Sequence, residues 1–157
     1  RRRPLLPLPA YRYVPGLQPH PWRSSEGHHH QESLPKMDAL WSEGQCWEQH
    51  QYFLHACDLF DYRYYWESHE TWEEIWHQVP RGHPDRSRLQ VLIQAAACCL
   101  KVHVNQLVAA QSLLERCQLR QGQFTPEVVD TDRLLVDLGT LVKGGDWPLI
   151  HALNQSV

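Results

Sequence analysis

The segment RLQVLIQAAACCLKVHV, residues 88–104, constrains the fold more than any other part of the chain. Projected as a helix at about 100° per residue, it carries one narrow polar stripe. The stripe consists of Gln90, Gln94, Lys101 and Asn105. Apart from His103, the remaining positions are apolar or small, so such a helix needs neighbours on almost every side. We therefore predict a bundle with this helix at its centre. The stripe faces either solvent or a buried polar site, and the pattern leaves both readings open.

Helical periodicity and helix breakers divide the rest of the body into further helices. We expect helices over residues 37–63 (whole, or divided near Gly44), 65–78, 85–104 and 107–121. A later helix is expected from 126 or 130 to 143, followed by a short final turn over 147–154 capped by Asp146. No strand-like alternation competes with these patterns. Because short loops between amphipathic helices make antiparallel neighbours, the predicted fold class is all-α, an antiparallel multi-helix bundle.

Residues 1–36 differ from the body because they hold most of the eleven prolines and show no helical period. The run PLLPLPAYRYVPGLQPHPW is typical of extended or polyproline-like chain. Its aromatic residues Tyr11, Tyr13 and Trp22 indicate that it lies against the body. We predict an extended N-terminal arm over residues 1–36 and a helical bundle domain over residues 37–157.

Charge and cysteine usage limit the partners and the compartment. The net charge is −3, and the only cluster of basic residues is Arg1 to Arg3, so no nucleic-acid partner is predicted. No stretch approaches the roughly 20 apolar residues of a membrane helix, so no membrane partner is predicted. The five cysteines lack CxxC spacing, which favours a reducing compartment. We expect a cytoplasmic protein.

The segment WESHETWEEIW, residues 66–76, places four carboxylates and one histidine among three tryptophans. On a helix, His69 and Glu73 lie one turn apart on the shoulder of the aromatic face. Glu67 and Glu74 project from another side, where water can solvate them. We predict a polar site at His69 and Glu73, walled by three tryptophans, with Glu70 and Gln94 as further candidate members. The wall residues are Trp66, Trp72 and Trp76.

Three explanations of the pair compete on the sequence alone. His69 and Glu73 satisfy each other and nearby amides as part of a helix interface, they bind a divalent metal, or Glu73 orients His69 for acid–base chemistry. Two known metal patterns are incomplete. HETWE starts like the zincin HExxH, in which Glu70 would be the base, but Glu73 replaces the second histidine. The ExxH at Glu74 to His77 lacks the second ExxH that di-iron bundles need.

The run LFDYRYYWESHETWEEIW, followed by RLQVLIQAAA, resembles the helical family catalogued as domain of unknown function 309. The family signature, His, three residues, Glu, two residues and an aromatic residue, is here His69, Glu73 and Trp76. The segment YRYVPGLQPHPWRSSEGH resembles the N-terminal extension of a bacterial subgroup. The resemblance implies an all-helical fold and a His/Glu motif that has been suggested to bind metal without an established reaction.

The chain departs from the family pattern at Val91, where a glycine is usual before the Leu-Ile pair. The bulkier side chain would crowd whatever the glycine allows to approach. His20 and His28 belong to the pattern of the extension, and a docked arm could deliver them to the His69 site. The competing reading makes them surface histidines of a flexible tail.

These observations lead to a metal-binding helical protein of unknown reaction, with a metal-dependent hydrolase as one form of that function. The predicted cofactor is a divalent metal ion of unidentified kind. Its ligands are His69 and Glu73, with Glu70, Gln94, His20 and His28 as weaker candidates. The alternative is a non-catalytic scaffold or interaction module in which the His/Glu pair is structural. An exposed aromatic face would favour a homodimer.

Overall fold

A computed structural model describes residues 2, 6–28, 30, 40–44, 47–121 and 129–151. Within these residues the chain forms five α-helices and one 3-10 turn, and no strand. The elements are η1 (Trp47–Gln49), α1 (Gln51–Asp61), α2 (Tyr65–Gln78), α3 (Pro84–His103), α4 (Leu107–Arg120) and α5 (Thr131–Val142). The predicted all-α fold class is confirmed. The bounds of α2 to α5 agree with the predicted helices to within one or two residues at nearly every end.

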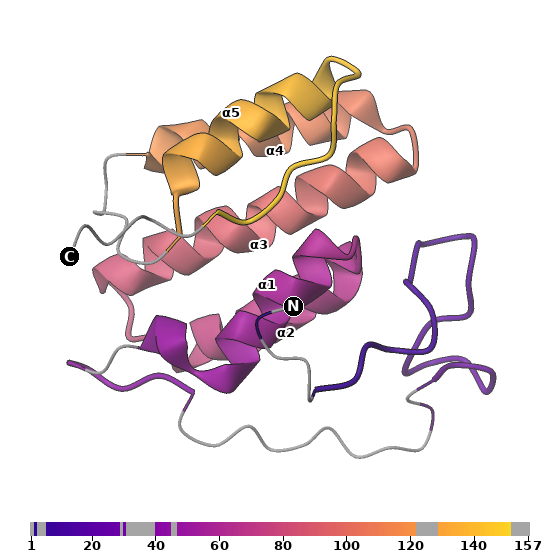
Figure 1. Cartoon of the computed structure of the whole chain (residues 1–157), viewed down its shortest axis with the longest axis horizontal. Coiled ribbons are helices and arrows are strands. Elements are labelled where there is room, and N and C mark those ends of the chain that lie inside the picture. The colour runs from indigo at the N-terminus through magenta and orange to yellow at the C-terminus, as the bar shows by residue number, and fades with distance from the viewer. Residues whose placement is uncertain are drawn as a thin grey trace.

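Helix α3 lies at the centre of the bundle, as its sequence predicted. The α1–α2 pair covers one side of it and the α4–α5 pair covers the other, and successive helices run in opposite directions (Figure 1). Leu89, Leu92, Ala95 and Cys99 of α3 are completely buried. Because α3 contacts helices on two sides, most of its apolar surface is removed from water, which is the main driving force for this arrangement.

The helix starts follow from local sequence. His50 and His83 accept hydrogen bonds from the backbone N–H groups of Tyr52 and Asp85, at the starts of α1 and α3. Pro84 occupies the first turn of α3, where its missing N–H costs nothing. Asp130 caps α5 by accepting from the backbone N–H of Arg133. These caps satisfy N–H groups that no helical carbonyl can reach.

Two predicted helical segments are wrong. Residues 40–44 are not helical, and α1 begins only at Gln51; Gly44 has φ +76°, a conformation outside the right-handed helix. The final turn expected after Asp146 is absent from residues 147–151, which have no regular secondary structure. There the backbone bonds to distant partners: Ile150 N–H donates to Asp61, and the His151 carbonyl accepts from the Asp130 N–H. These tertiary bonds replace those that a helical turn would make.

The N-terminal arm has no helix or strand over its described residues 6–28, but it is extended less than predicted, because residues 15–18 and 21–28 form turns and bends. A turn closes where Leu17 N–H donates to the Val14 carbonyl, with Gly16 at φ +83°. Val14 is almost fully buried, 4% exposed, so the arm lies against the body as its aromatic content predicted. The boundary that we place after residue 36 lies outside the described residues and stays a prediction.

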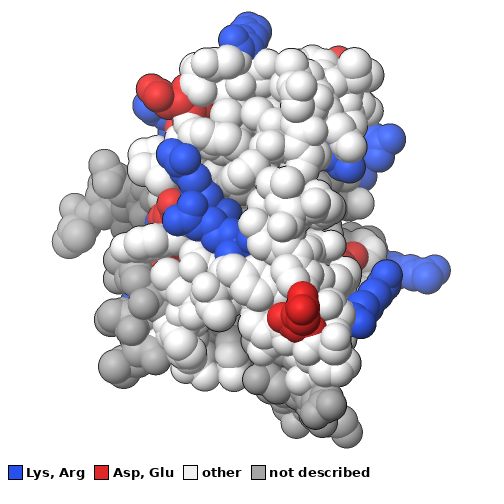
Figure 2. Space-filling model, turned by 90° about the vertical axis from the view of Figure 1, so that its right-hand side faces the viewer, with Lys and Arg blue, Asp and Glu red and all other residues white. Residues whose placement is uncertain are grey.

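None of the described helices is long and apolar enough to cross a membrane. On the face shown in Figure 2, lysine and arginine side chains stand in a few small groups, with acidic side chains nearby. The described cysteines, Cys57, Cys98, Cys99 and Cys117, are free and buried. They therefore act as small apolar core residues, as the run AAACCL indicated.

The seven tryptophans are all within the described residues, and each is buried or half-buried. The large apolar side chains that do face water are mostly aliphatic: Leu17, Tyr62, Leu107, Val108, Leu119, Val136 and Leu149. The expected exposed tryptophan face, which was the argument for a homodimer, is therefore absent. The reason is that the arm and α3 cover indole rings that the α2 sequence alone leaves open.

Candidate functional site

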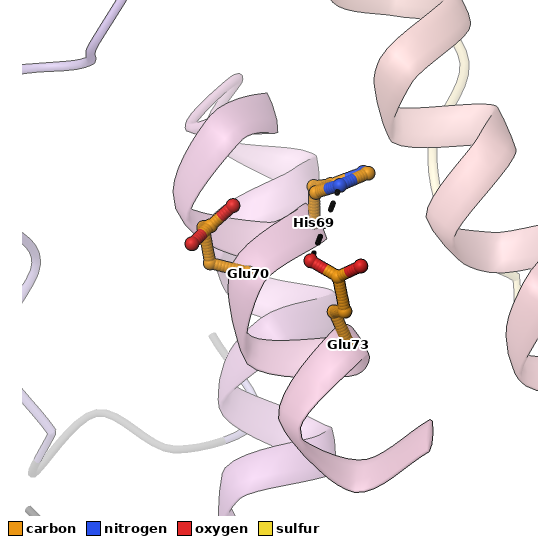
Figure 3. Close-up of side chains that lie close together, drawn as sticks. All are labelled: His69, Glu70 and Glu73. Atoms are coloured by element: carbon orange, nitrogen blue, oxygen red, sulfur yellow. Dashed lines mark ion pairs between the residues drawn. The ribbon is translucent and has the colours of Figure 1, made fainter. Parts of the chain in front are cut away.

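Three side chains of α2 bring possible metal ligands together. One ligand atom from each of His69, Glu70 and Glu73 lies within 4.8 Å of the other two. The residues stand at i, i+1 and i+4, so a single helical turn supplies the whole cluster. Figure 3 shows His69 and Glu73 side by side, with Glu70 leaning to the other side of the helix. The predicted pairing of His69 with Glu73 is present in the fold.

The imidazole of His69 is oriented by the neighbouring helix. Its Nδ1 lies 3.1 Å from the backbone carbonyl oxygen of Ile93 in α3. A carbonyl oxygen can only accept, so Nδ1 carries the hydrogen of this bond. In the neutral ring, Nε2 is then the nitrogen with the free lone pair. A carbonyl behind the ring that fixes orientation and tautomer is the usual arrangement of histidine ligands.

The free nitrogen faces a carboxylate. Nε2 of His69 lies 3.7 Å from Oε2 of Glu73, and the two side chains are 28% and 41% exposed. When the ring is neutral, both facing atoms are hydrogen-bond acceptors and cannot bond to each other directly. A proton on Nε2 or a cation between the two atoms resolves this opposition. Because the site is half open to water, either can enter from solvent.

Glu70 has a perturbed acidity. Burial raises the pKa of its carboxyl group above the ordinary value, and the neighbouring carboxylates Glu73 and Glu74 raise it further. His69 and Arg23 act in the opposite direction. A carboxylate that is disfavoured by desolvation and by like charges gains free energy when a cation approaches it.

The weaker candidate ligands lie elsewhere. Gln94 directs its side-chain oxygen to the Cys117 thiol of α4, 3.8 Å away. His20 uses Nδ1 to accept from the backbone N–H groups of Trp22 and Arg23, and its ring packs 5.5 Å from Trp66. His28 packs edge-on against Tyr11, with 4.4 Å between ring centres. Among the described residues, neither arm histidine belongs to the His69 cluster.

The three tryptophans of the predicted wall have three different environments. Trp66 contacts Tyr13 and His20 of the arm. Trp72 is completely buried between Phe53 and Phe60 of α1. The ring of Trp76 stacks under the guanidinium group of Arg86, 3.5 Å away. Trp72 is thus a core residue, and the indoles do not share one set of neighbours around the cluster.

The expectation that Glu67 is solvated is wrong. Glu67 is only 6% exposed because the arm covers it, and its Oε1 accepts from the backbone N–H of Tyr13 at 2.8 Å. Its Oε2 is buried and has no hydrogen-bond partner among the described residues. Burial raises the pKa of Glu67 to about 7, although the Tyr13 N–H opposes the rise. Glu74 is exposed, as expected.

The polar stripe is divided between two environments, and neither half joins the His69 cluster. Asn105 is exposed and Lys101 donates to the exposed Gln106 at 2.8 Å, so this half faces water, whereas the two glutamines face α4. Gln90 accepts from Arg120 at 3.1 Å and Gln94 contacts Cys117, so both glutamines are half-buried against α4. Val91, where the resemblance led us to expect a glycine, is completely buried in the core, and its carbonyl accepts from the Cys117 thiol at 3.7 Å. The valine therefore forms part of the α3–α4 contact.

Comparison with known proteins identifies one segment. Residues 53–113, from α1 to the middle of α4, match the family described as Domain of unknown function (DUF309). The matched segment contains the whole His69, Glu70 and Glu73 cluster and the Ile93 carbonyl that orients it. The match does not include the arm, so its assignment to a bacterial subgroup stays a prediction. No curated protein and no solved structure is significantly similar to this chain.

Proposed function

We propose that this DUF309 domain binds one divalent metal ion through His69, Glu70 and Glu73. The observation that carries the proposal is the opposition of two acceptors: Nε2 of His69, with its hydrogen fixed on Nδ1 by Ile93, faces Oε2 of Glu73 at 3.7 Å. A cation between them would be attracted to both atoms. A proton on Nε2 would join only this pair, whereas a cation could also take an oxygen of Glu70 as a ligand.

The spacing of the cluster fits a metal ion after small side-chain adjustments. Two ligands that each stand about 2.1 Å from a tetrahedral ion lie about 3.4 Å from one another. The His69–Glu73 separation is close to that value, and the third ligand atom lies within 4.8 Å. Half-exposed glutamates can change rotamer to close the remaining gap, while the His69 ring is already held by α3.

The donor set narrows the class of metal. One imidazole nitrogen with two carboxylate oxygens suits zinc, manganese or ferrous iron better than soft, thiolate-preferring ions. Three protein ligands leave at least one coordination position for water, which is the arrangement of catalytic sites and not of closed structural ones. A metal-dependent hydrolase is therefore the finer form of this proposal, because a bound divalent ion lowers the pKa of water.

The second candidate function is a non-catalytic helical scaffold. The hydrogen bond from His69 to the Ile93 carbonyl ties α2 to α3 whether or not a metal is present. In that reading, a protonated His69 pairs with Glu73 and holds the helices in register. The scaffold function requires no cation, so the two candidates differ in one measurable property.

The test is titration of the tag-free chain, residues 1–157, with zinc, manganese and ferrous iron. Calorimetry measures the binding of each metal, and elemental analysis gives the number of ions bound per chain. We expect one ion per chain for the wild type. Removing one of three protein ligands should weaken binding by about a hundredfold or more in His69→Asn and Glu73→Gln. The matched controls on the same helix are the exposed residues His77 and Glu74; His77→Asn and Glu74→Gln should bind like the wild type.

The histidine run at residues 28–30 could bind metal by itself, so each measurement is repeated in a chain that carries asparagine at these positions. One ion per chain should remain in that background. If binding disappears with the histidine run, or survives in His69→Asn and Glu73→Gln, the metal proposal is wrong and the scaffold function is favoured.

A further inference from the structure

We propose that the start of α2 is a recognition site for extended, proline-rich peptides, occupied here by the chain's own arm. The site, which we call the arm-binding surface, consists of Tyr64, Trp66 and Glu67. Its partner in trans would be a peptide of the same chemistry as the arm, with proline, arginine and tyrosine in the order of PAYRY, residues 9–13. This inference does not depend on the metal proposal.

Two hydrogen bonds to the main chain fix the register of the bound segment. The Tyr64 hydroxyl donates to the Pro9 carbonyl at 3.2 Å, and Glu67 accepts from the Tyr13 N–H at 2.8 Å. The two main-chain groups are four residues apart. Extended and polyproline-like chain leaves such groups free, whereas helices and sheets use them internally. The arm-binding surface therefore recognises the main chain of an extended peptide.

Aromatic contacts supply the side-chain part of recognition. The Tyr13 ring packs edge-on against Trp66, with 5.1 Å between centres and an interplanar angle of 82°. His20 packs on the same indole at 5.5 Å. The guanidinium group of Arg12 lies 5.5 Å from the centre of the Tyr64 ring. An aromatic-lined surface that docks proline-rich chain is a recurrent mode of peptide recognition.

A cation–π contact favours a basic residue in the bound peptide. The Arg12 guanidinium lies over the face of the Tyr64 ring, which attracts a cation. The arm supplies Arg12 and Arg23, both exposed, while Ala10 between the two anchor points is also exposed. The recognised features are thus a proline carbonyl, an arginine and a tyrosine. The position between the proline and the aromatic residues is free to vary.

The surface is built without the arm. Ser68, which is completely buried, donates to the Ala56 carbonyl at 2.9 Å and fixes α2 on α1. Trp72 anchors the next turn among Phe53 and Phe60. The body therefore presents Tyr64, Trp66 and Glu67 whether or not an arm lies on them. A tethered arm competes with free peptide at an effective concentration that reaches the millimolar range for short flexible tethers. External peptide should consequently bind well only when the arm is displaced.

The test uses the full-length chain and a fluorescent synthetic peptide of residues 6–28. Tyr13→Pro removes both the N–H that Glu67 accepts and the ring that contacts Trp66, so it should free the surface. We expect this variant to bind the peptide at least about tenfold more tightly than the wild type, measured by fluorescence anisotropy. Leu17→Ala, at an arm residue that is 69% exposed, is the matched control and should behave like the wild type.

Substitutions of the surface decide whether the peptide binds where the arm does. In the Tyr13→Pro background, Trp66→Leu should abolish most of the gain, and Tyr64→Phe should reduce it. A scrambled peptide of the same composition should bind no better to Tyr13→Pro than to the wild type.

His69→Asn should leave peptide binding unchanged, which separates this inference from the metal site. Circular dichroism verifies that each variant is folded. The proposal is overturned if folded Tyr13→Pro gains no binding, or if Trp66→Leu leaves the gain intact.

Discussion

Glutamate side chains on two sides of α2 differ in their exposure to water. On the arm-facing side, Glu67 is 6% exposed and bonds to a backbone N–H, and its pKa rises to about 7. On the α3-facing side, the side chain of Glu73 is 41% exposed and faces an imidazole nitrogen. The two glutamates are fewer than two turns apart. The comparison teaches that the covering segment, and not the helix sequence, decides which carboxylate is sequestered and which is open to a ligand.

The largest expected effect concerns the buried acid. Because the folded pKa of Glu67, about 7, exceeds its ordinary value of 4.5, the native state holds the proton more tightly than the unfolded state. The stability from this group is therefore complete below about pH 4.5 and is lost as the pH rises to 7 and above. The difference corresponds to about 3 kcal/mol. Urea unfolding of Glu67→Gln should show equal stability to wild type at pH 4 and greater stability at pH 8.

The exposed Glu74, on the same helix, provides the control for this pH dependence. Glu74→Gln should retain the wild-type loss of stability between pH 4.5 and 8. Equal pH profiles for Glu67→Gln and the wild type would mean that Glu67 is hydrated in solution, and the contrast between the two sides of α2 would fail.

The second prediction concerns metal binding on the α3-facing side of α2. At a metal concentration about 100 times the Kd, binding to the native state alone should raise the free energy of unfolding by about 2.7 kcal/mol. Thermal unfolding should show this gain in the wild type and in Tyr13→Pro, and should not show it in Glu73→Gln. An equal gain in Glu73→Gln would place the bound ion away from the α3-facing side.

A smaller effect is expected for the bond between α2 and α3. His69→Phe keeps a ring of similar shape but leaves the Ile93 carbonyl without its side-chain donor. A lost hydrogen bond of this kind costs about 1 kcal/mol, and the loss should occur in chelator-treated protein. Chemical unfolding in the presence of a chelator measures it. An unchanged midpoint would show that α3 does not hold the imidazole.

The smallest effect belongs to the arm contact. Tyr64→Phe removes the hydroxyl that donates to the Pro9 carbonyl and retains the ring under Arg12. We expect a loss of about 0.5–1 kcal/mol in arm docking, seen as faster amide exchange at Tyr13. Exchange within the core residues of α3 should stay the same. Faster exchange throughout the chain would indicate a general loss of stability and not a local one.

The sequence predicted local structure well where its signals were local. The breakers after Gln78 predicted the end of α2, and the apolar surface of α3 predicted its central position. The i, i+4 spacing of His69 and Glu73 predicted that their side chains would lie together. Such features depend on neighbours within one or two turns, which the sequence states directly.

The failures arose where distant segments competed with local preference. Residues 147–151 have helix-compatible composition, yet the backbone of Ile150 bonds to Asp61, 89 positions earlier. Trp72 was expected to wall the site, but α1 offers it Phe53 and Phe60, and the core removes it from water. Only the fold placed the Ile93 carbonyl behind His69, because no spacing in the chain relates residues on separate helices.

The amino-acid sequence by itself determined the helices of this protein, their amphipathic faces and the pairing of His69 with Glu73. The tertiary structure alone decided that Glu67 is covered, that His69 presents Nε2, and that the tryptophans turn toward three different neighbours. The physical reason is range: periodicity and capping act within a few residues, whereas burial and the choice of hydrogen-bond partner depend on segments far apart in the chain.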